Sequence, residues 1–162
     1  MERVSKHEYY LDIAETVSER STCLRRRFGA IIVKNDVIIS TGYNGAPRGR
    51  KNCSDLASCY REKLGIPRGQ RYELCRSVHS EANAIIAAPR DQMIGSTLYM
   101  CCTDPKTGEV VSGTNNCMMC KRLVLNAGIT TVVIRDKKGE HRIVNTQDWI
   151  EDDDSLSGEL GY

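Results

Sequence analysis

Apolar positions in the first third of the chain follow two different periods. Between residues 5 and 20 they recur with helical spacing, which predicts an amphipathic helix. The next two apolar runs, FGAIIV (28–33) and VIISTG (37–42), are rich in β-branched residues and are separated by the polar triplet KND. Runs of this kind around a short polar turn predict a β-hairpin.

The second half of the chain alternates between helical and strand-like segments. We predict helices over residues 80–88, where Pro89 ends the helix, and over 117–128, and strands over 96–102 and 129–135. Strands that alternate with helices indicate right-handed crossovers and parallel pairing. Together with the hairpin, this pattern predicts a single α/β domain with a mixed sheet.

Two stretches have neither period. Residues 43–77 contain glycine, proline, arginine and three cysteines without a regular apolar pattern. An irregular stretch of this length in a compact domain is usually functional or held by something specific. Residues 151–162 are acidic and contain glycine and serine. We therefore predict a domain over 1–150, followed by a flexible tail over 151–162.

Composition places the chain among globular proteins. It has 162 residues, of which 40% are hydrophobic and 27% charged, values typical of one domain with its own core. No apolar run is long enough for a transmembrane helix, and the charged N-terminal region has no apolar signal core, so we expect a cytoplasmic location. In a reducing compartment, eight cysteines indicate metal ligands, buried thiols or redox groups rather than disulfides.

The net charge of +2 conceals an uneven distribution. The last twelve residues hold five acidic side chains and no basic one, so the rest of the chain has 23 basic residues against 16 acidic ones, a net charge of +7. A basic body suits a partner that carries phosphate, either a nucleotide or a polynucleotide. The aromatic content of 6% offers no obvious stacking platform for a long single strand.

Two short motifs combine the residue types of a metal site. His79 and Glu81 stand at the start of one predicted helix, and Cys117 and Cys120 at the start of another. Cysteines three apart lie on one helical face, so both sulfurs can reach one ion. Two thiolates and one imidazole leave the fourth tetrahedral position of zinc open, as in catalytic zinc sites. Either motif alone would be explained more simply, by surface residues or a redox pair, but their joint occurrence predicts a zinc centre.

Glu81 is not needed as a metal ligand. A carboxylate beside such a centre can carry a proton from the attacking water to a leaving nitrogen. His-x-Glu followed by Pro-Cys-x-x-Cys is the signature of zinc nucleobase deaminases. Here Asn116 replaces the proline, which binds no metal and only favours the start of the helix. The motifs therefore predict a zinc-dependent hydrolytic deaminase.

From about residue 9 to residue 135 the chain resembles the deoxycytidylate (dCMP) deaminases of bacterial and phage type, within the zinc-dependent cytidine deaminase superfamily. The resemblance is carried by STCLRRRFGAIIV, STGYNGAPRG, CYREKLGIPRGQRYELCRSVHSEANAI and NNCMMCKRLVLNAGI. GYNG-x-P loops are characteristic of this branch. Ser80 stands where the family usually has alanine, and Asn116 where it has proline. The resemblance implies a three-layer sandwich, with a mixed five-stranded sheet and helices on both faces.

The resemblance also implies an activity. It is the hydrolysis of dCMP to dUMP and ammonia, which would supply dUMP for thymidylate synthesis. His79, Cys117 and Cys120 would bind zinc, and Glu81 would be the proton carrier. The backbone of Ser80 would contact the pyrimidine edge.

Further residues are implied as contacts for the nucleotide. Asn44 would hydrogen-bond the sugar and help to place the base. Arg25 matches a basic position of the family, and its guanidinium can grip a phosphate in bidentate fashion. The GYNG loop is the family's regulatory element, so the candidate contacts for a regulatory nucleotide are Gly42, Tyr43, Gly45 and Arg48.

The resemblance implies partners as well. They are dCTP as activator, dTTP as inhibitor, and further copies of the chain in a hexamer or dimer. Arg48 is also an alternative phosphate contact.

The remaining front-half cysteines allow two interpretations. Cys23, Cys53, Cys59 and Cys75 bracket the irregular stretch 43–77. Four thiolates would complete a second, structural zinc site and would order this stretch. Alternatively, they are buried free thiols, since their spacing is no metal-binding motif.

Three rival functions stay open. A deaminase that acts on a polynucleotide base would share the zinc centre but would need a wide basic and aromatic groove, and the chain has one tryptophan and one phenylalanine. An inactive nucleotide-binding zinc protein would have no use for Glu81. A modified dCMP, such as a 5-methyl or hydroxymethyl form, is a further substrate candidate.

Overall fold

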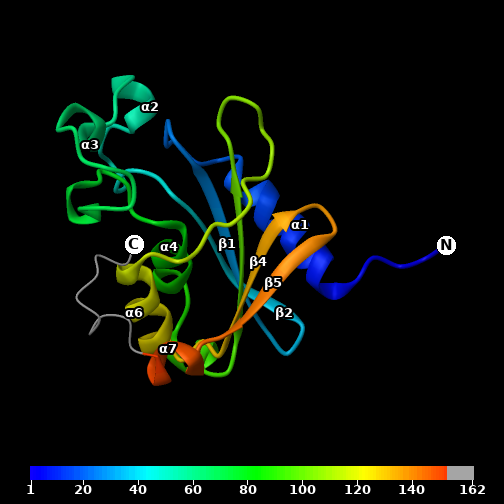
Figure 1. Ribbon diagram of the computed structural model, residues 1–162. Helices are drawn as coiled ribbons and strands as arrows, with labels where there is room; N and C mark the ends of the chain where they lie inside the picture. The colour runs from blue at the N-terminus through cyan, green and yellow to red at the C-terminus, as the bar shows by residue number, and fades with distance from the viewer. Residues whose placement is uncertain (153–162) are drawn as a thin grey trace.

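The computed structural model describes residues 1–152 (Figure 1). The strands are β1 (Arg27–Lys34), β2 (Val37–Tyr43), β3 (Thr97–Thr103), β4 (Thr131–Lys137) and β5 (Glu140–Asn145). The helices are α1 (Lys6–Ser18), α2 (Cys53–Leu56), α3 (Tyr60–Lys63), α4 (Ser80–Ile86), α5 (Arg90–Met93), α6 (Met118–Ala127) and α7 (Gln147–Glu151), with a 3-10 turn at Tyr72–Leu74. Of the predicted tail 151–162, Glu151 ends α7, and residues 153–162 lie outside the described part. Within residues 1–152, no helix is both long and apolar enough to cross a membrane.

The five strands form one mixed sheet. Their order is β2-β1-β3-β4-β5, and each neighbouring pair is antiparallel except β3 and β4, which are parallel. Helix α1 packs on one face, and α4 and α6 cover the other, which gives three layers (Figure 1). The predicted α/β class, mixed sheet and helices on both faces are confirmed.

The predicted hairpin joins β1 to β2 through a tight turn. Asn35 and Asp36 both have a positive φ, of 50° and 62°, between the paired residues Lys34 and Val37. Two consecutive left-handed residues are what a two-residue hairpin turn requires, and asparagine and aspartate tolerate that conformation best after glycine. The polar triplet therefore sets the register of the front of the sheet.

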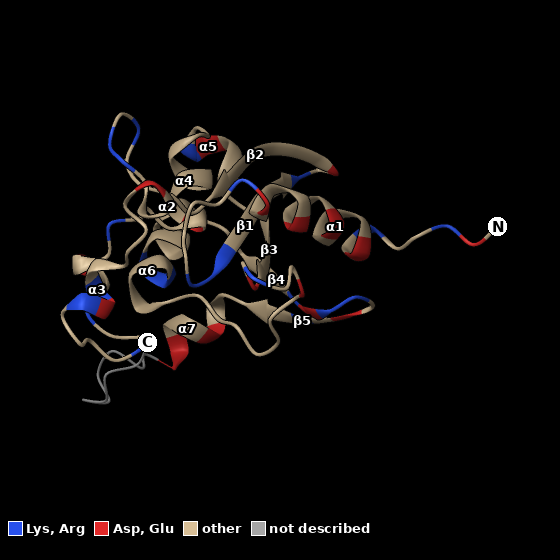
Figure 2. Ribbon diagram, turned by 90° about the horizontal axis from the view of Figure 1, so that it is seen from above, with Lys and Arg blue, Asp and Glu red and all other residues tan. Residues whose placement is uncertain are grey.

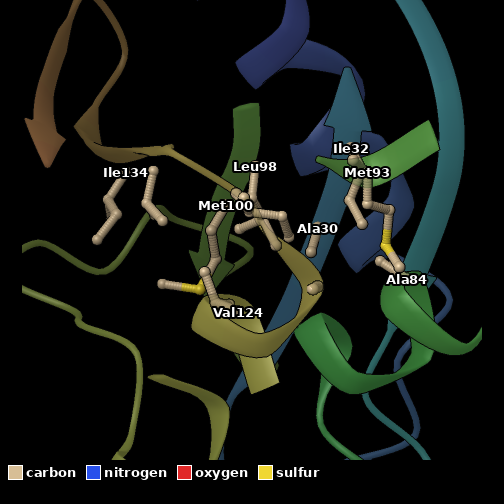
Figure 3. Packing of buried hydrophobic residues seen from close by; sticks show 11 residues of the cluster. Ala30, Ile32, Ala84, Met93, Leu98, Met100, Val124 and Ile134 are labelled. Atoms are coloured by element: carbon tan, nitrogen blue, oxygen red, sulfur yellow. The ribbon is translucent and has the colours of Figure 1, made fainter. Parts of the chain in front are cut away.

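The core consists of two clusters, one on each face of the sheet. Neighbouring strand residues point to opposite faces, so Ile32 of β1 packs toward α4, while Ile31 packs toward α1. Figure 3 shows side chains from β1, β3, α4 and α6 meeting in the first cluster. The central strands β1, β3 and β4 are thus covered on both faces, which fixes the positions of the helices.

A fully buried arginine attaches α1 to the sheet. The guanidinium of Arg135 in β4 lies 2.7 Å from a carboxylate oxygen of Glu8, 2.8 Å from Asp12 and 2.7 Å from Glu15. These three acidic residues lie on one face of α1, four and three residues apart, and Figure 2 shows the acidic residues along this helix. Helix α1 is therefore held by ion pairs as well as by apolar packing.

Replacement of Arg135 with methionine is expected to destabilise the fold. It leaves three neighbouring carboxylates without their cation, and breaking a buried ion pair costs roughly 3–5 kcal/mol. Water can reach the partly exposed Asp12 and Glu15, so we expect the lower end of that range for the loss in free energy of unfolding. Urea denaturation measures it, with Arg122→Met on the exposed side of α6 as the control. Equal midpoints for the two variants would contradict the stabilising role.

Candidate metal centre and active site

The first half of the site is the N-terminus of α4. His79 is the N-cap residue of this helix, with an extended backbone (φ −69°, ψ 155°), and Ser80 and Glu81 form its first turn. The helix lies directly on Gly42 of β2, where a Cβ atom would be 2.3 Å from the Ser80 carbonyl oxygen and 2.4 Å from the Ala84 nitrogen. Only glycine permits this close approach, so β2 fixes the position of His79 and Glu81.

The second half is the N-terminus of α6. Cys117 is the N-cap residue, and its sulfur accepts a hydrogen bond from the backbone N–H of Cys120 (3.4 Å). The helix ends at Gly128, which has a φ of +81° as its C-cap. Both limits agree with the predicted helix. The two sulfurs therefore lie on the first turn of α6, which packs beside α4.

The two halves meet in one set of metal-binding atoms. Nδ1 of His79 lies 3.4 Å from the sulfur of Cys117 and 3.4 Å from that of Cys120. Within residues 1–152, this is the one group of three such residues whose ligand atoms all lie within 4.8 Å of one another. On a tetrahedral zinc ion, nitrogen at about 2.0 Å and sulfur at about 2.3 Å would be separated by roughly 3.5 Å. The residues present therefore fit zinc with three protein ligands.

The protonation of the three ligands also suits a cation. A hydrogen bond from Cys120, and others involving His79, lower the pKa of the Cys117 thiol to about 5, although burial opposes this. The same bond to Cys117, together with burial, raises the pKa of Cys120. Burial lowers the pKa of His79, but hydrogen bonds to Cys117 and Cys75 and the charge of Glu81 outweigh it and raise the pKa to about 10. Without a metal, protons on Cys120 and His79 offset the negative charge of this cluster. A divalent metal ion displaces such protons when it binds.

Glu81 lies beside this centre without being part of the ligand set. Its side chain is buried. The Ser80 hydroxyl donates to Oε1 (2.8 Å), and Nδ2 of Asn116 donates to Oε2 (2.9 Å). Both carboxylate oxygens are therefore held by neutral donors. The sequence identified Asn116 only as a replacement for the proline at the helix start and did not predict this contact, although an amide in place of proline was the available signal.

The centre opens into a cavity of about 840 Å³. Segment 43–77 supplies much of the wall, as an irregular functional stretch would. Six cationic residues line the cavity, and among the described residues Glu81 is the one acidic side chain of the lining. The cationic residues are Arg25, Arg26, Arg61, Arg68, Arg76 and Lys121. This balance suits a ligand with a negatively charged group.

All three predicted substrate contacts, Asn44, Ser80 and Arg25, line the cavity. Nε of Arg25 lies 3.0 Å from a carboxylate oxygen of Glu62, while its Nη1 is buried and has no hydrogen-bond partner within residues 1–152. Oδ1 of Asn44 accepts from the Phe28 N–H (2.8 Å), and its Nδ2 donates to the Arg26 carbonyl (3.0 Å). Arg25 therefore offers an unused donor, and Asn44 one remaining N–H.

The predicted second zinc site is not supported. Cys23, Cys53, Cys59 and Cys75 all line the cavity. However, no three of their sulfurs lie within 4.8 Å of one another, as a shared ion would require. Instead, Cys75 interacts with the metal-ligand candidate His79, which lowers the pKa of the Cys75 thiol and raises that of His79.

An arginine holds the irregular stretch in place of the expected metal. Arg61 is buried, its Nε donates to the Gln70 carbonyl (3.0 Å), and its Nη2 donates to the Pro67 carbonyl (3.1 Å). Its guanidinium also stacks over the ring of Tyr72, 4.5 Å from the centroid. These hydrogen bonds provide donors for carbonyl oxygens of the loop that have no partner in a helix or strand. Residues 61–72 are thus ordered by one cation from within the segment.

The four residues predicted to bind a regulatory nucleotide lie in different environments. Gly42 is buried under α4, and Gly45 is buried and pairs with Val78 through two backbone hydrogen bonds. Tyr43 and Arg48 are exposed. The glycines serve close packing, so Tyr43 and Arg48 are the side chains of this loop that solvent and ligands can reach.

Comparison with known proteins agrees with this geometry. The sequence profile of the family described as "Cytidine and deoxycytidylate deaminase zinc-binding region" matches residues 4–135. The deoxycytidylate deaminase of Mycobacterium phage D29 is 38% identical over 138 residues, which cover 82% of this chain and 96% of the phage protein. The deoxycytidylate deaminase of Schizosaccharomyces pombe is 31% identical over 131 residues, which cover 81% of this chain but 37% of the yeast protein.

A solved structure gives the same result for the fold. The crystal structure of dCMP deaminase from the cyanophage S-TIM5 in complex with dCMP and dUMP is 26% identical. It superposes with a TM-score of 0.55 over 98% of this chain and 96% of the phage chain. The two proteins therefore share the arrangement of sheet and helices.

Proposed function

We propose that the chain, which belongs to the family of the cytidine and deoxycytidylate deaminase zinc-binding region, hydrolyses dCMP to dUMP and ammonia. The observation that carries the proposal is the convergence of His79, Cys117 and Cys120 beside the buried Glu81. The cationic cavity in front of these residues suits a nucleotide with a phosphate group. Support also comes from the relatives named deoxycytidylate deaminase and from the phage structure with dCMP and dUMP.

Glu81 performs the proton transfers. Zinc, when bound by His79, Cys117 and Cys120, supplies a Lewis acid that makes water nucleophilic at neutral pH. Glu81 accepts a proton from the water that attacks C4 of the cytosine, and passes it to N3. It then moves the second proton of that water to the 4-amino nitrogen. The C4–N bond breaks, ammonia leaves, and C4 keeps the oxygen as the carbonyl of dUMP.

The rest of the cavity places the nucleotide. Asn44 directs its remaining N–H to the sugar, and the backbone of Ser80 contacts the pyrimidine edge. Arg25 contacts the phosphate through its guanidinium, whose Nη1 has no hydrogen-bond partner within residues 1–152, because hydrogen bonds between charged groups are strong. This assignment keeps the base at the metal centre and the phosphate at the cationic wall.

Replacement of Arg25 with methionine is expected to raise KM for dCMP by about 10–100-fold with little change in kcat. A hydrogen bond to a charged group contributes roughly 1.5–3 kcal/mol, and a contact far from the reacting atoms affects binding of ground state and transition state alike. Steady-state kinetics with dCMP and deoxycytidine measure the effect, and Arg20→Met at an exposed position is the control. An equal loss for deoxycytidine, which has no phosphate, would contradict the assignment.

Ammonia release from four substrates tests the function as a whole. The purified protein is incubated with dCMP, dCTP, cytidine and a single-stranded oligonucleotide, and turnover of dCMP is expected. Turnover of the oligonucleotide alone would identify a polynucleotide deaminase. Absence of any turnover with zinc bound would identify a nucleotide-binding protein without activity. Adding 5-methyl and 5-hydroxymethyl dCMP decides whether a modified base is preferred.

The partners expected from the resemblance stay predictions. The expected effectors are dCTP as activator and dTTP as inhibitor, and the expected protein partner is a further copy of the chain in a homo-oligomer. The cytoplasmic location is likewise a prediction. Tyr43 and Arg48 are the exposed candidates for contact with a regulatory nucleotide. A sigmoidal dependence of rate on dCMP that dCTP makes hyperbolic would support such regulation. A rate of dCMP turnover that neither dCTP nor dTTP changes would count against this regulation.

A further inference from the structure

The side-chain amide of Asn116 forms a hydrogen bond through its nitrogen but not through its oxygen. The residue is 4% exposed, and it stands directly before the ligand candidate Cys117. Nδ2 donates to Oε2 of Glu81 (2.9 Å) and lies 3.7 Å from the sulfur of Met100. Oδ1 is buried and has no hydrogen-bond partner within residues 1–152. A carboxylate only accepts hydrogen bonds, so the nitrogen must face Glu81, and the oxygen is the unpaired atom.

An unpaired buried carbonyl oxygen needs an explanation. Leaving such an acceptor without a donor costs roughly 1–3 kcal/mol, and buried polar groups in folded proteins are nearly always satisfied. Asn116 lines the cavity that faces the metal centre. Oδ1 itself is covered in the ligand-free protein, so a ligand in that cavity can supply the missing donor after a small movement of this side chain.

The chemistry of the base identifies the donor. On the polar edge of cytosine, O2 and N3 are acceptors, and the 4-amino group is the donor. Glu81 must lie within hydrogen-bonding distance of that amino nitrogen to deliver its proton. Asn116 is bonded to the same carboxylate. The oxygen of its short planar amide is therefore close to where the amino group will lie.

Resting on the proposed function, we propose that Asn116 recognises the 4-amino group of dCMP and is a specificity-determining residue. Its Nδ2 holds Glu81, and its Oδ1 accepts a hydrogen bond from the amino group and then from the departing ammonia. In dUMP, an oxygen replaces the amino nitrogen at C4. Two acceptors then face each other, so the same contact that favours the substrate disfavours the product.

Opposite effects on substrate and product test this role. In a Glu81→Gln background, where dCMP persists, calorimetry measures Kd for dCMP and for dUMP with and without Asn116→Ala. We expect the affinity for dCMP to fall by about tenfold, as for a lost hydrogen bond of about 1.4 kcal/mol. The affinity for dUMP should stay the same or increase. Asn126→Ala, at an exposed position of α6, is the matched control, and Asn116→Ser replaces the alanine variant if that variant does not fold.

The remaining outcomes overturn the inference. An equal loss of affinity for both nucleotides would mean a structural role only, and no change for either would mean that Asn116 does not touch the base. The parent chain with Glu81 intact is assayed in parallel for ammonia release from dCMP. If it shows none, the proposed function itself fails. If the parent chain turns over dCMP but Asn116→Ala does not change the ratio of the Kd values for dCMP and dUMP, only this inference fails.

Discussion

Replacement of Glu81 with glutamine is expected to reduce dCMP turnover by at least 10²–10⁴-fold, the usual contribution of a positioned proton carrier. Glutamine has nearly the same shape, and its oxygen can still accept the bond from Asn116. It has no basic oxygen, however, and cannot take up and release the proton. Since Glu81 lies outside the ligand set, zinc content should stay that of the parent protein. Ammonia release, metal analysis and a thermal melt measure the three quantities.

The control for this variant is Glu109→Gln, which makes the same change at an exposed position. It should leave rate, metal content and melting temperature unaltered. If Glu81→Gln turned over dCMP within tenfold of the parent rate, another group would have to carry the proton. A large loss of zinc in that variant would instead place Glu81 among the metal ligands.

Replacement of Cys120 with alanine is expected to remove both the metal and the activity. Two of three ligands remain, and the lost one is a buried thiol on the first turn of α6. Zinc should fall from about one ion per chain, as for one site of this type, to background after dialysis, and ammonia release should fall to background with it. A ligand that binds the native state at 1,000 times its Kd adds roughly 4 kcal/mol of stability. A chelator should therefore lower the melting temperature of the parent protein but not that of the variant.

Cys59→Ser provides the matched thiol control for zinc content. Cys59 belongs to the four-cysteine group that does not gather around an ion, so its loss should leave about one zinc per chain. A parent protein with two ions per chain, of which Cys59→Ser loses one, would restore the second site. Full zinc content in Cys120→Ala would contradict the assigned centre.

Much of the fold was predictable because its main elements have strong apolar periods. The hairpin, α1, α4, β3, β4 and α6 all lie within a few residues of their predicted limits. Strand β5 was missed from the pattern, although the family resemblance implied a fifth strand. It is an edge strand without a fully buried residue, so it lacks the apolar signal on which such predictions depend. The one-turn helices α2, α3 and α5 are too short to show a helical period.

The site was predictable where chemistry depends on spacing, and not where it depends on packing. Histidine and two cysteines at helix starts predicted the metal-binding set, which is confirmed. The hydrogen bond of Asn116 to Glu81 joins residues 35 apart, and sequence spacing does not show such a contact. Arg61 likewise orders its segment through carbonyl groups that every residue has. The second zinc site, one of two interpretations of the front-half cysteines, is not supported within residues 1–152, and Arg61 orders part of the segment through hydrogen bonds instead.

The two faces of the sheet have separate tasks. The metal-binding set and Glu81 lie at the N-termini of α4 and α6, on one face of the sheet. Helix α1 and its ion pairs with Arg135 lie on the opposite face. The ion pairs of Arg135 therefore stabilise the fold without involving the metal-binding set or Glu81. A thermostable variant can therefore be sought by redesigning the contacts between α1 and the sheet, without changing the residues that line the cavity.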